Sequence, residues 1–168
     1  YGKTAGGGHL GRGVLFAYDY VNNIFAPLRS FGFSDQGGGK NLIEIENGTF
    51  YGVSGGLIYK YNTLTSTFTT LAEFADSIGL NPQGKLLLAD NGKLYGVTKI
   101  RGLNNKGVLF EYDRILDTLI AKFHFSSSFG SEPAGRLMQA SNGKIYGTTS
   151  SEGAHYGGSL FEYDIILD

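Results

Sequence analysis

The dipeptide Tyr-Gly recurs four times in this chain of 168 residues, at intervals of 50, 44 and 51 residues. A second block of apolar and aromatic residues, ending in Asp or Asn, follows each copy in step. The copies begin at Tyr1, Tyr51, Tyr95 and Tyr146, and the second blocks are residues 15–19, 58–62, 109–113 and 160–164. Two blocks in step define one structural unit of about fifty residues, and repeats of that length form stacked or radially arranged architectures.

The clearest unit, residues 84–125, predicts four antiparallel strands. Asn91-Gly92 follows a short apolar run and predicts a hairpin in which both turn residues adopt positive φ. No segment keeps a sustained 3.6-residue apolar period, so we expect no helix. The expected strands of this unit are residues 85–89, 94–98, 108–113 and 118–125.

Four antiparallel strands per unit form the blade of a β-propeller. The expected fold is therefore all-β, an arc of two complete blades flanked by two incomplete ones. The first blade lacks its first strand and the last lacks its fourth, so we expect a fragment of a larger propeller; a ring closed by another chain is the alternative. The expected repeats are approximately 1–33, 41–74, 84–125 and 135–168, within a single segment 1–168.

The composition excludes several classes of protein. Lys and Arg number 14 against 15 Asp and Glu, for a net charge of −1, so we expect neither nucleic acid nor an anionic membrane as partner. No apolar run reaches the roughly 18 residues that span a bilayer, so membrane insertion is not expected. The chain has no cysteine, which excludes disulfides and thiolate metal sites but leaves the compartment open.

The long loops are the expected place for function, because binding residues concentrate in loops on a rigid scaffold. Strand alternation puts the tight turns on one face and the long loops on the other. The long loops are 3–12, 98–106 and 148–157 within units, and 32–40, 75–83 and 126–134 between units. The candidate ligand-binding residues are Arg12, Arg101, Asn104, Asn105, Glu152, His155 and Tyr156.

Three segments resemble catalytic or nucleotide-binding motifs. Residues 6–11 fit G-x-G-x-x-G, residues 79–85 nearly fit a phosphate-binding loop, and residues 52–56 fit G-x-S-x-G. Each motif needs a helix directly after it, whereas a strand is expected here. We therefore interpret all three as structural, and Ser54 as the donor or acceptor of a local hydrogen bond within the blade.

The recurring acids invite a paired-carboxylate interpretation, as in glycosidases. Asp19, Asp113 and Asp164 recur at the end of the third strand, however, with Asn62 in register. Asp and Asn at such positions cap turns through nearby backbone N–H groups. Glu111 and Glu162 also recur, but Lys and Ala stand at the same position in other units, so no catalytic residue is predicted.

The three histidines are His9, His124 and His155. His9 and His155 fall in equivalent loops, where we expect surface polar residues, with a sugar or metal contact as the alternative. His124 lies on a fourth strand and is expected to be structural. Neither a metal ion nor a cofactor is expected. The repeated tyrosines are expected to pack between blades, with the adjacent glycine allowing close approach of the neighbouring sheet.

Three linked segments resemble the bacterial repeat family called GloVer: Gly-Lys-Leu-Tyr-Gly-Val-Thr (92–98), Gly-Val-Leu-Phe-Glu-Tyr-Asp (107–113) and Ser-Glu-Pro-Ala-Gly-Arg-Leu (131–137). The resemblance covers the whole chain. It departs from the family pattern in the first connector, where 37–39 are glycines in place of the Pro of Pro82 and Pro133, and in the shortened loop 54–56. It implies an extracellular or bacterial cell-surface location and supplies no catalytic residues.

The leading hypothesis is a non-catalytic β-propeller module of a secreted or surface protein. It would mediate protein or glycan binding, adhesion or assembly through its long-loop face. One alternative is a propeller hydrolase or lyase that acts on polysaccharide, with acids lining a central channel. The other is a purely structural repeat that self-assembles in an extracellular filament or surface assembly.

Overall fold

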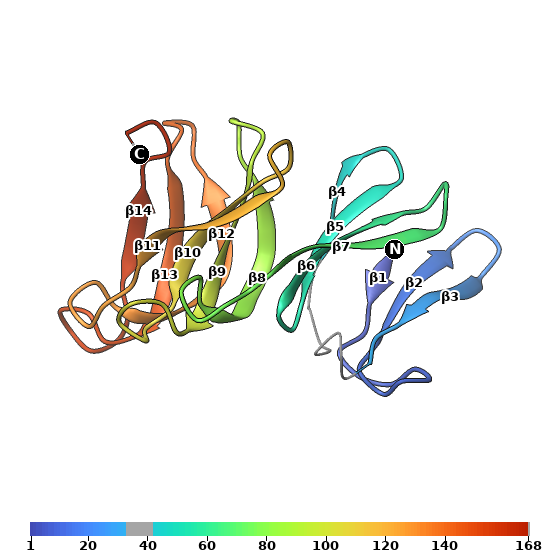
Figure 1. Ribbon diagram of the computed structural model, residues 1–168, viewed down its shortest axis with the longest axis horizontal. Coiled ribbons are helices and arrows are strands. Elements are labelled where there is room, and N and C mark those ends of the chain that lie inside the picture. The colour runs from blue at the N-terminus through green and yellow to red at the C-terminus, as the bar shows by residue number, and fades with distance from the viewer. Residues whose placement is uncertain (33–41, 168) are drawn as a thin grey trace. The chain divides into compact units, whose positions relative to one another are not determined.

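The structure is a computed structural model that describes residues 1–32 and 42–167 (Figure 1). Its contacts divide the chain into two compact units, Tyr1–Glu73 and Phe74–Asp168, and each unit holds two antiparallel sheets. All the elements in the described ranges are strands. The first connector predicted, 32–40, lies outside the described residues apart from Gly32.

The first unit contains a sheet of three strands and a sheet of four strands. Neighbours in the sequence are neighbours in each sheet, so both are simple meanders. The strands are β1 (Gly2–Lys3), β2 (Val14–Asp19) and β3 (Ile24–Ser30), followed by β4 (Leu42–Glu46), β5 (Thr49–Ser54), β6 (Leu57–Asn62) and β7 (Thr67–Glu73).

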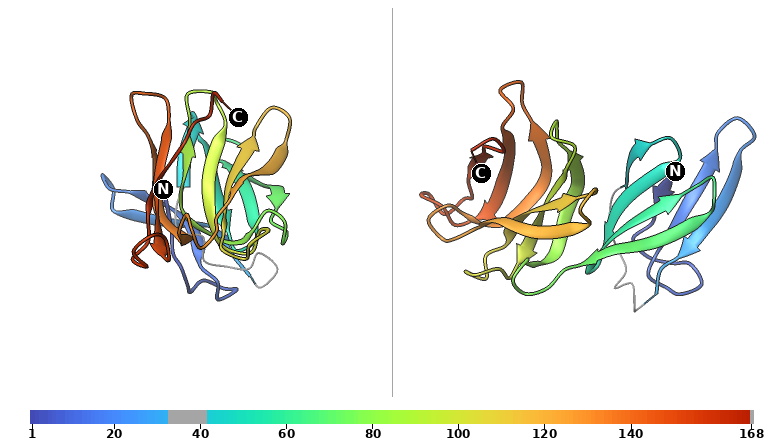
Figure 2. Two further views of the ribbon diagram at one scale, coloured as in Figure 1. Left: turned by 90° about the vertical axis from the view of Figure 1, so that its left-hand side faces the viewer. Right: turned by 45° about the horizontal axis from the view of Figure 1, so that its top comes forward.

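The second unit also consists of two meander sheets, here in the reverse order: a sheet of four strands and then a sheet of three (Figure 2). The strands are β8 (Leu80–Leu88), β9 (Leu94–Ile100), β10 (Val108–Asp113) and β11 (Thr118–His124), followed by β12 (Ser131–Gln139), β13 (Ile145–Ser151) and β14 (Leu160–Tyr163). The predicted all-β fold of two complete and two incomplete blades is confirmed. The predicted third strand, Val108–Asp113, matches β10 at both ends.

The repeats also agree in register. Each pairing of a third with a fourth strand contains a bulge at the same place, after Leu15, after Ile58 and after Leu109. A bulge bends the strand and increases its twist. The repeated sequence therefore specifies the curvature of each blade as well as its strands.

The glycine of Tyr-Gly has a different role from the one predicted. In every sheet it lies directly opposite the aromatic residue of the third strand, and the ring covers it. A Cβ atom on Gly52 would lie 2.6 Å from the Oη of Tyr59, and one on Gly96 would collide with the ring of Phe110. The prediction of close approach by a neighbouring sheet is wrong at these glycines, because the ring of their own sheet occupies the space.

Close approach between sheets occurs instead at Gly84. Its φ is +65°, and a Cβ atom there would collide with the carbonyl oxygen of Gly135 in the next sheet of the same unit. Only glycine accepts both conditions without strain.

The repeated tyrosines contribute to the core where their sheet is covered. Tyr51 and Tyr95 are buried, whereas Tyr1 is exposed at the edge of the first sheet. Tyr95 packs across to Tyr163 of the neighbouring sheet, with ring centroids 6.4 Å apart. The core of the second unit consists of Ala89, Tyr95, Val97, Leu109, Phe125, Leu137 and Ile145, and that of the first of Leu15, Phe31, Tyr59 and Tyr61.

Two of the connectors between sheets differ from the prediction. The loops 75–83 and 126–134 are shorter than expected, because β8 and β12 begin inside them: Leu80 pairs with Ile100, and Ser131 with Ser151. The pairing of β8 with β9 shifts register between Gln83 and Leu87, and that of β12 with β13 shifts between Ala134 and Met138. Each of these long strands therefore pairs with its neighbour on both sides of a bulge.

In the Asn-Gly turns only the glycine has positive φ, for example +78° at Gly92. The Gly92 N–H donates to the carbonyl of Ala89 (2.8 Å). The Oδ1 of Asn91 accepts from the N–H of Lys93 (3.1 Å). The asparagine side chain therefore caps a turn that the glycine closes, as in a type I turn followed by a left-handed residue.

Strands follow all three motifs that resemble catalytic or nucleotide-binding loops, as predicted. The strand β2 follows residues 6–11, β6 follows 52–56, and residues 79–85 run into β8 itself. No helix in the described part of the chain is long and apolar enough to cross a membrane.

Candidate binding surface

Three loops between second and third strands share one backbone conformation. Positive φ recurs at the same four positions of each loop, although the residues differ. The positions are Gly7, Gly8, Gly11 and Gly13 in the first loop, Arg101, Gly102, Asn105 and Gly107 in the second, and Glu152, Gly153, Tyr156 and Gly158 in the third. The non-glycine residues there accept a conformation that costs L-residues energy, so the frame of the loop overrides local preference.

Hydrogen bonds at the base of each loop hold this frame. In the second loop the Gly107 N–H donates to the carbonyl of Arg101 (3.0 Å). The hydroxyl of Thr98 accepts from the N–H of Val108 (3.1 Å). Thr4 and Thr149 make the same bond at 2.9 and 2.8 Å. The base is therefore constant, while the side chains at the tip can vary.

The second repeat has only a short turn in place of this loop. There the hydroxyl of Ser54 accepts a hydrogen bond from Lys3 Nζ (2.8 Å). Lys3 belongs to β1 of the other sheet of the first unit. The bond is structural but joins two sheets, so the predicted bond within the blade is not the one observed.

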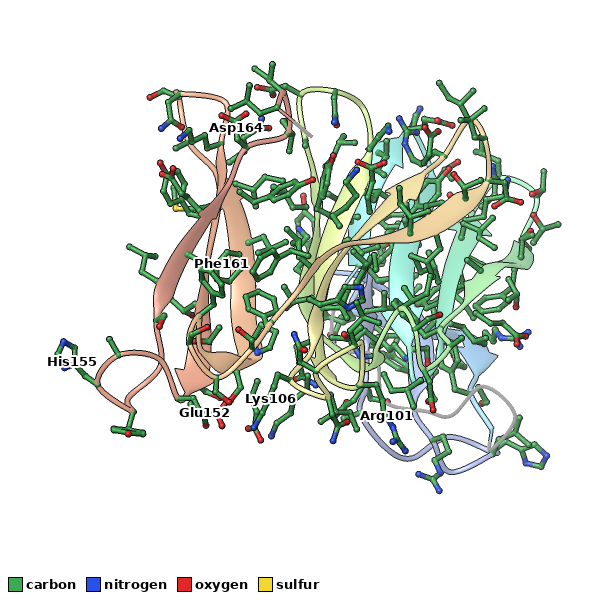
Figure 3. The ribbon with its side chains drawn as sticks, turned by 60° about the vertical axis from the view of Figure 1, so that its left-hand side comes forward. Arg101, Lys106, Glu152, His155, Phe161 and Asp164 are labelled. Carbon is green, nitrogen blue, oxygen red and sulfur yellow. The ribbon has the colours of Figure 1, made fainter. Side chains whose placement is uncertain are left out.

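Six of the seven predicted binding residues lie in the second unit, and Arg12 lies exposed in the first. We call the loops 99–107 and 150–158, with the connectors 75–79 and 126–132, the long-loop surface of the second unit. Arg101, Lys106, Glu152 and His155 gather at one end of the sheets, and Asp164 lies at the opposite end (Figure 3). The predicted separation of long loops from tight turns is confirmed in this unit.

The predicted residues differ in what they contact. Arg101 Nε lies 3.7 Å from a carboxylate oxygen of Asp76. Asn104 donates from Nδ2 to the carbonyl of Phe125 (3.0 Å), which fastens the loop to the segment after β11. Asn105 is exposed and occupies a left-handed position.

Glu152 is half-buried and pairs with Lys106 of the neighbouring loop at 2.7 Å. The Lys106 ammonium holds the pKa of Glu152 below its usual range. A second ion pair joins Lys99 to Glu132 at 3.3 Å, and the Glu132 N–H donates to the carbonyl of Lys106 (3.0 Å). Sequence reasoning missed both ion pairs, although opposite charges at neighbouring loops were a visible signal.

His155 and Tyr156 stand at the tip of the last loop, and Tyr156 is 87% exposed. Leu103 and Phe129 are also largely exposed on the long-loop surface. The Gly153 N–H donates to the carbonyl of Ser127 (3.0 Å), so the loop that carries Tyr156 lies against the connector that carries Phe129.

The three histidines have different surroundings. The Nδ1 of His124 accepts from the N–H of Leu103 (3.2 Å), a structural contact, as predicted for this residue. His9 and His155 are exposed in different units. Within the described residues, no group of three or more His, Cys, Asp or Glu side chains is arranged to hold a metal ion.

The recurring acids at the opposite end cap turns, as predicted. Asp113 Oδ1 accepts from the N–H groups of Ile115 and Leu116 at 2.9 and 3.0 Å. These bonds lower the pKa of Asp113. Asp19 and Asn62 make the same pair of contacts, and Asp164 makes the first of them.

Glu111 and Glu162 each lie in a polar network that sequence reasoning missed. Glu111 accepts from Lys93 Nζ (2.7 Å) and from the hydroxyl of Tyr95 (2.5 Å). Glu162 accepts from Lys144 and Tyr146 at 2.6 and 3.0 Å. These contacts join second and third strands, so the networks are structural.

An apolar cleft of about 110 Å³ lies between the two sheets of the second unit. Its lining contains one carboxylate, that of Glu162, which is already engaged with Lys144. The remaining lining residues are Leu109, Phe123, Phe129, Phe161 and Tyr163. Burial raises the pKa of the Tyr163 hydroxyl to about 12, so this group stays protonated at neutral pH.

Solved structures share the fold of this chain. The extracellular domain of a B. thetaiotaomicron protein described as a hybrid two-component system matches with a TM-score of 0.64 and 19% identity, over 96% of this chain and 19% of that chain. A nidogen/laminin complex matches at 0.62 and 10% identity, over 92% and 58%. TolB from Acinetobacter baumannii matches at 0.57 and 15% identity, over 92% and 35%.

These neighbours include propeller-type domains, which supports the assignment of the sheets as propeller blades. The chain spans about a fifth of the length of the first of them. Among the curated proteins compared, none matches this sequence. A family profile described as the Gloeobacter/Verrucomicrobia repeat matches residues 1–166, with every repeat included. This chain belongs to the Gloeobacter/Verrucomicrobia repeat family.

Proposed function

We propose that this chain is a non-catalytic recognition module of a secreted or cell-surface bacterial protein, which binds a protein or a glycan through its long loops. The observation that carries the proposal is the shared frame of the three loops: constant base bonds and four constant left-handed positions support different side chains at the tips. A constant frame with variable tips suits recognition, because binding residues can change without loss of the fold.

The recurring polar groups support a non-catalytic role. Asp113 is engaged by backbone N–H groups, and Glu111 by lysine and tyrosine. Those contacts use the acids for folding, where a glycosidase would leave two carboxylates facing a substrate. The extracellular domains among the structural neighbours agree with a location outside the cell.

An array of polysaccharides and extracellular proteins tests the proposal. The variant Arg101→Asn/His155→Ala/Tyr156→Asn removes three exposed side chains; asparagine is chosen at the two left-handed positions because it accepts that conformation. Asn104 is kept because it holds the loop. We expect wild type to bind and the variant to lose at least about tenfold in affinity, with an unchanged melting temperature.

The matched control is Ile115→Ser/Leu116→Ser, which changes two exposed residues in a tight turn after β10. This control should bind as wild type does. Equal binding by wild type and the loop variant, or weakening by the control alone, would place recognition elsewhere and overturn the proposal.

A further inference from the structure

The charged side chains of the long-loop surface neutralise one another. Its segments, 75–79, 99–107, 126–132 and 150–158, contain three Lys and Arg residues and three Asp and Glu residues. All six are used in three ion pairs: Arg101 with Asp76, Lys99 with Glu132, and Lys106 with Glu152. The described surface therefore offers no net charge to attract a charged partner.

The uncharged groups that remain exposed include two aromatic rings, hydroxyls and amides, together with Leu103 and His155. Tyr156 is 87% exposed and Phe129 is 60% exposed, and they stand on adjoining segments, joined by the bond from Gly153 N–H to the carbonyl of Ser127. Ser127 and Ser128 precede Phe129 on the same connector and are exposed, and Asn105 is exposed on the other long loop of this surface. Rigid rings with an apolar face, interspersed with small hydrogen-bonding residues, form an effective recognition surface.

We propose that the long-loop surface of the second unit binds an uncharged glycan. This inference rests on the proposed function and narrows its ligand, a protein or a glycan, to one class. A sugar ring has an apolar C–H face that stacks on an aromatic ring and a rim of hydroxyls that pair with serine and asparagine. A stable protein interface buries about 800 Å² on each partner around a contiguous apolar centre. Here the exposed apolar residues are single side chains on different loops, which matches a sugar chain better.

The repeats themselves supply the variants for a test. Asn105 stands at the loop position of Tyr156, and Ile78 stands at the connector position of Phe129. The variant Phe129→Ile/Tyr156→Asn therefore replaces both rings with residues that the same backbone already accommodates one repeat earlier. Tyr156→Phe keeps the ring and serves as the matched control.

The experiment measures binding of the whole chain to immobilised neutral polysaccharides (dextran, xylan, galactomannan), to anionic ones (alginate, polygalacturonate, heparin) and to an array of extracellular proteins. We expect binding to a neutral polysaccharide that changes little between about 50 and 500 mM NaCl, because no charges are paired across the interface. Phe129→Ile/Tyr156→Asn should weaken it at least about tenfold, and Tyr156→Phe less than about threefold.

Binding to anionic polysaccharides alone, or to proteins alone, would overturn the uncharged-glycan inference and leave the recognition module standing. Neutral binding that the double variant leaves intact would overturn the role of the two rings, and with it the inference. Binding to none of the three panels would overturn the inference and contradict the proposed function as well.

Discussion

The two sheets of the second unit carry the same polar network in two different environments. We call β8–β11 the third sheet and β12–β14 the fourth sheet of the chain. In the third sheet Lys93 and Tyr95 both donate to Glu111, and in the fourth Lys144 and Tyr146 both donate to Glu162. Glu111 is 3% exposed, whereas the side chain of Glu162 is 51% exposed. Identical partners therefore work in surroundings of very different polarity.

The sheet that covers each network accounts for the difference. Leu109 and Glu111 lie on one face of β10, and Leu109 packs in the core with Leu137 and Ile145 of the fourth sheet. Leu160 and Glu162 lie on the corresponding face of β14, which no further sheet covers in the described part of this unit, and Leu160 is 74% exposed. The repeat sequence thus specifies which groups meet, while the covering sheet determines how far they are buried.

The largest difference between the two sheets is expected when the aromatic ring over the glycine of Tyr-Gly is removed. Phe110 is 1% exposed and packs edge-on against Phe74, with centroids 4.9 Å apart. Phe110→Ala leaves a cavity and should lower the free energy of unfolding by about 3–5 kcal/mol. Phe161→Ala removes a half-buried ring and should cost about 1–2 kcal/mol. Urea titrations followed by far-UV circular dichroism measure both, and equal losses would contradict the comparison.

A smaller effect is expected from the acids themselves. Glu111→Gln weakens two charge-assisted hydrogen bonds in a buried setting and should lower the free energy of unfolding by about 2 kcal/mol. Glu162→Gln should cause a clearly smaller loss, because water can replace the contacts of an exposed carboxylate. The same urea titrations measure this pair. If the two variants lose the same free energy of unfolding, burial does not determine how much each Lys–Tyr–Glu network stabilises the fold.

The fold was predictable from the sequence because each repeat supplies independent copies of the same local signals. The Tyr-Gly period, the Asn-Gly turns and the Asp caps all agree, and β10 covers the residues 108–113 that were expected to form the third strand. The role of Gly96 was not predictable, because it depends on the register that puts the Phe110 ring over it.

The candidate surface was predictable only in part. The loops that carry His155 and Tyr156 followed from strand alternation. The pairing of Lys106 with Glu152 joins residues 46 positions apart. Their opposite charges were visible in the sequence, but which charges meet depends on how neighbouring blades pack. Asn104 was predicted to be a binding residue because it is polar and in a loop, and the structure adds that its amide holds that loop in place.

The ion pair between the two sheets gives the smallest expected effect and a pH dependence. Because Lys106 lowers the pKa of Glu152 in the folded protein, the unfolded chain takes up this proton at higher pH than the folded chain does. The pair therefore stabilises the fold above the ordinary glutamate value of 4.5, and this contribution is lost as the pH falls through the lowered pKa of the folded state.

The measurement is the difference in melting temperature between wild type and Glu152→Gln, followed from pH 7 to about pH 3. A small difference should be present at pH 7 and shrink to nothing below the lowered pKa. Asp19 and Asp113, whose pKa values are also lowered, titrate in both proteins and cancel in the difference. Lys106→Met should show the same pH-dependent difference in melting temperature from wild type. A gap that persists undiminished at low pH would mean that Glu152 acts through packing, and that the third and fourth sheets are joined without the help of this charge.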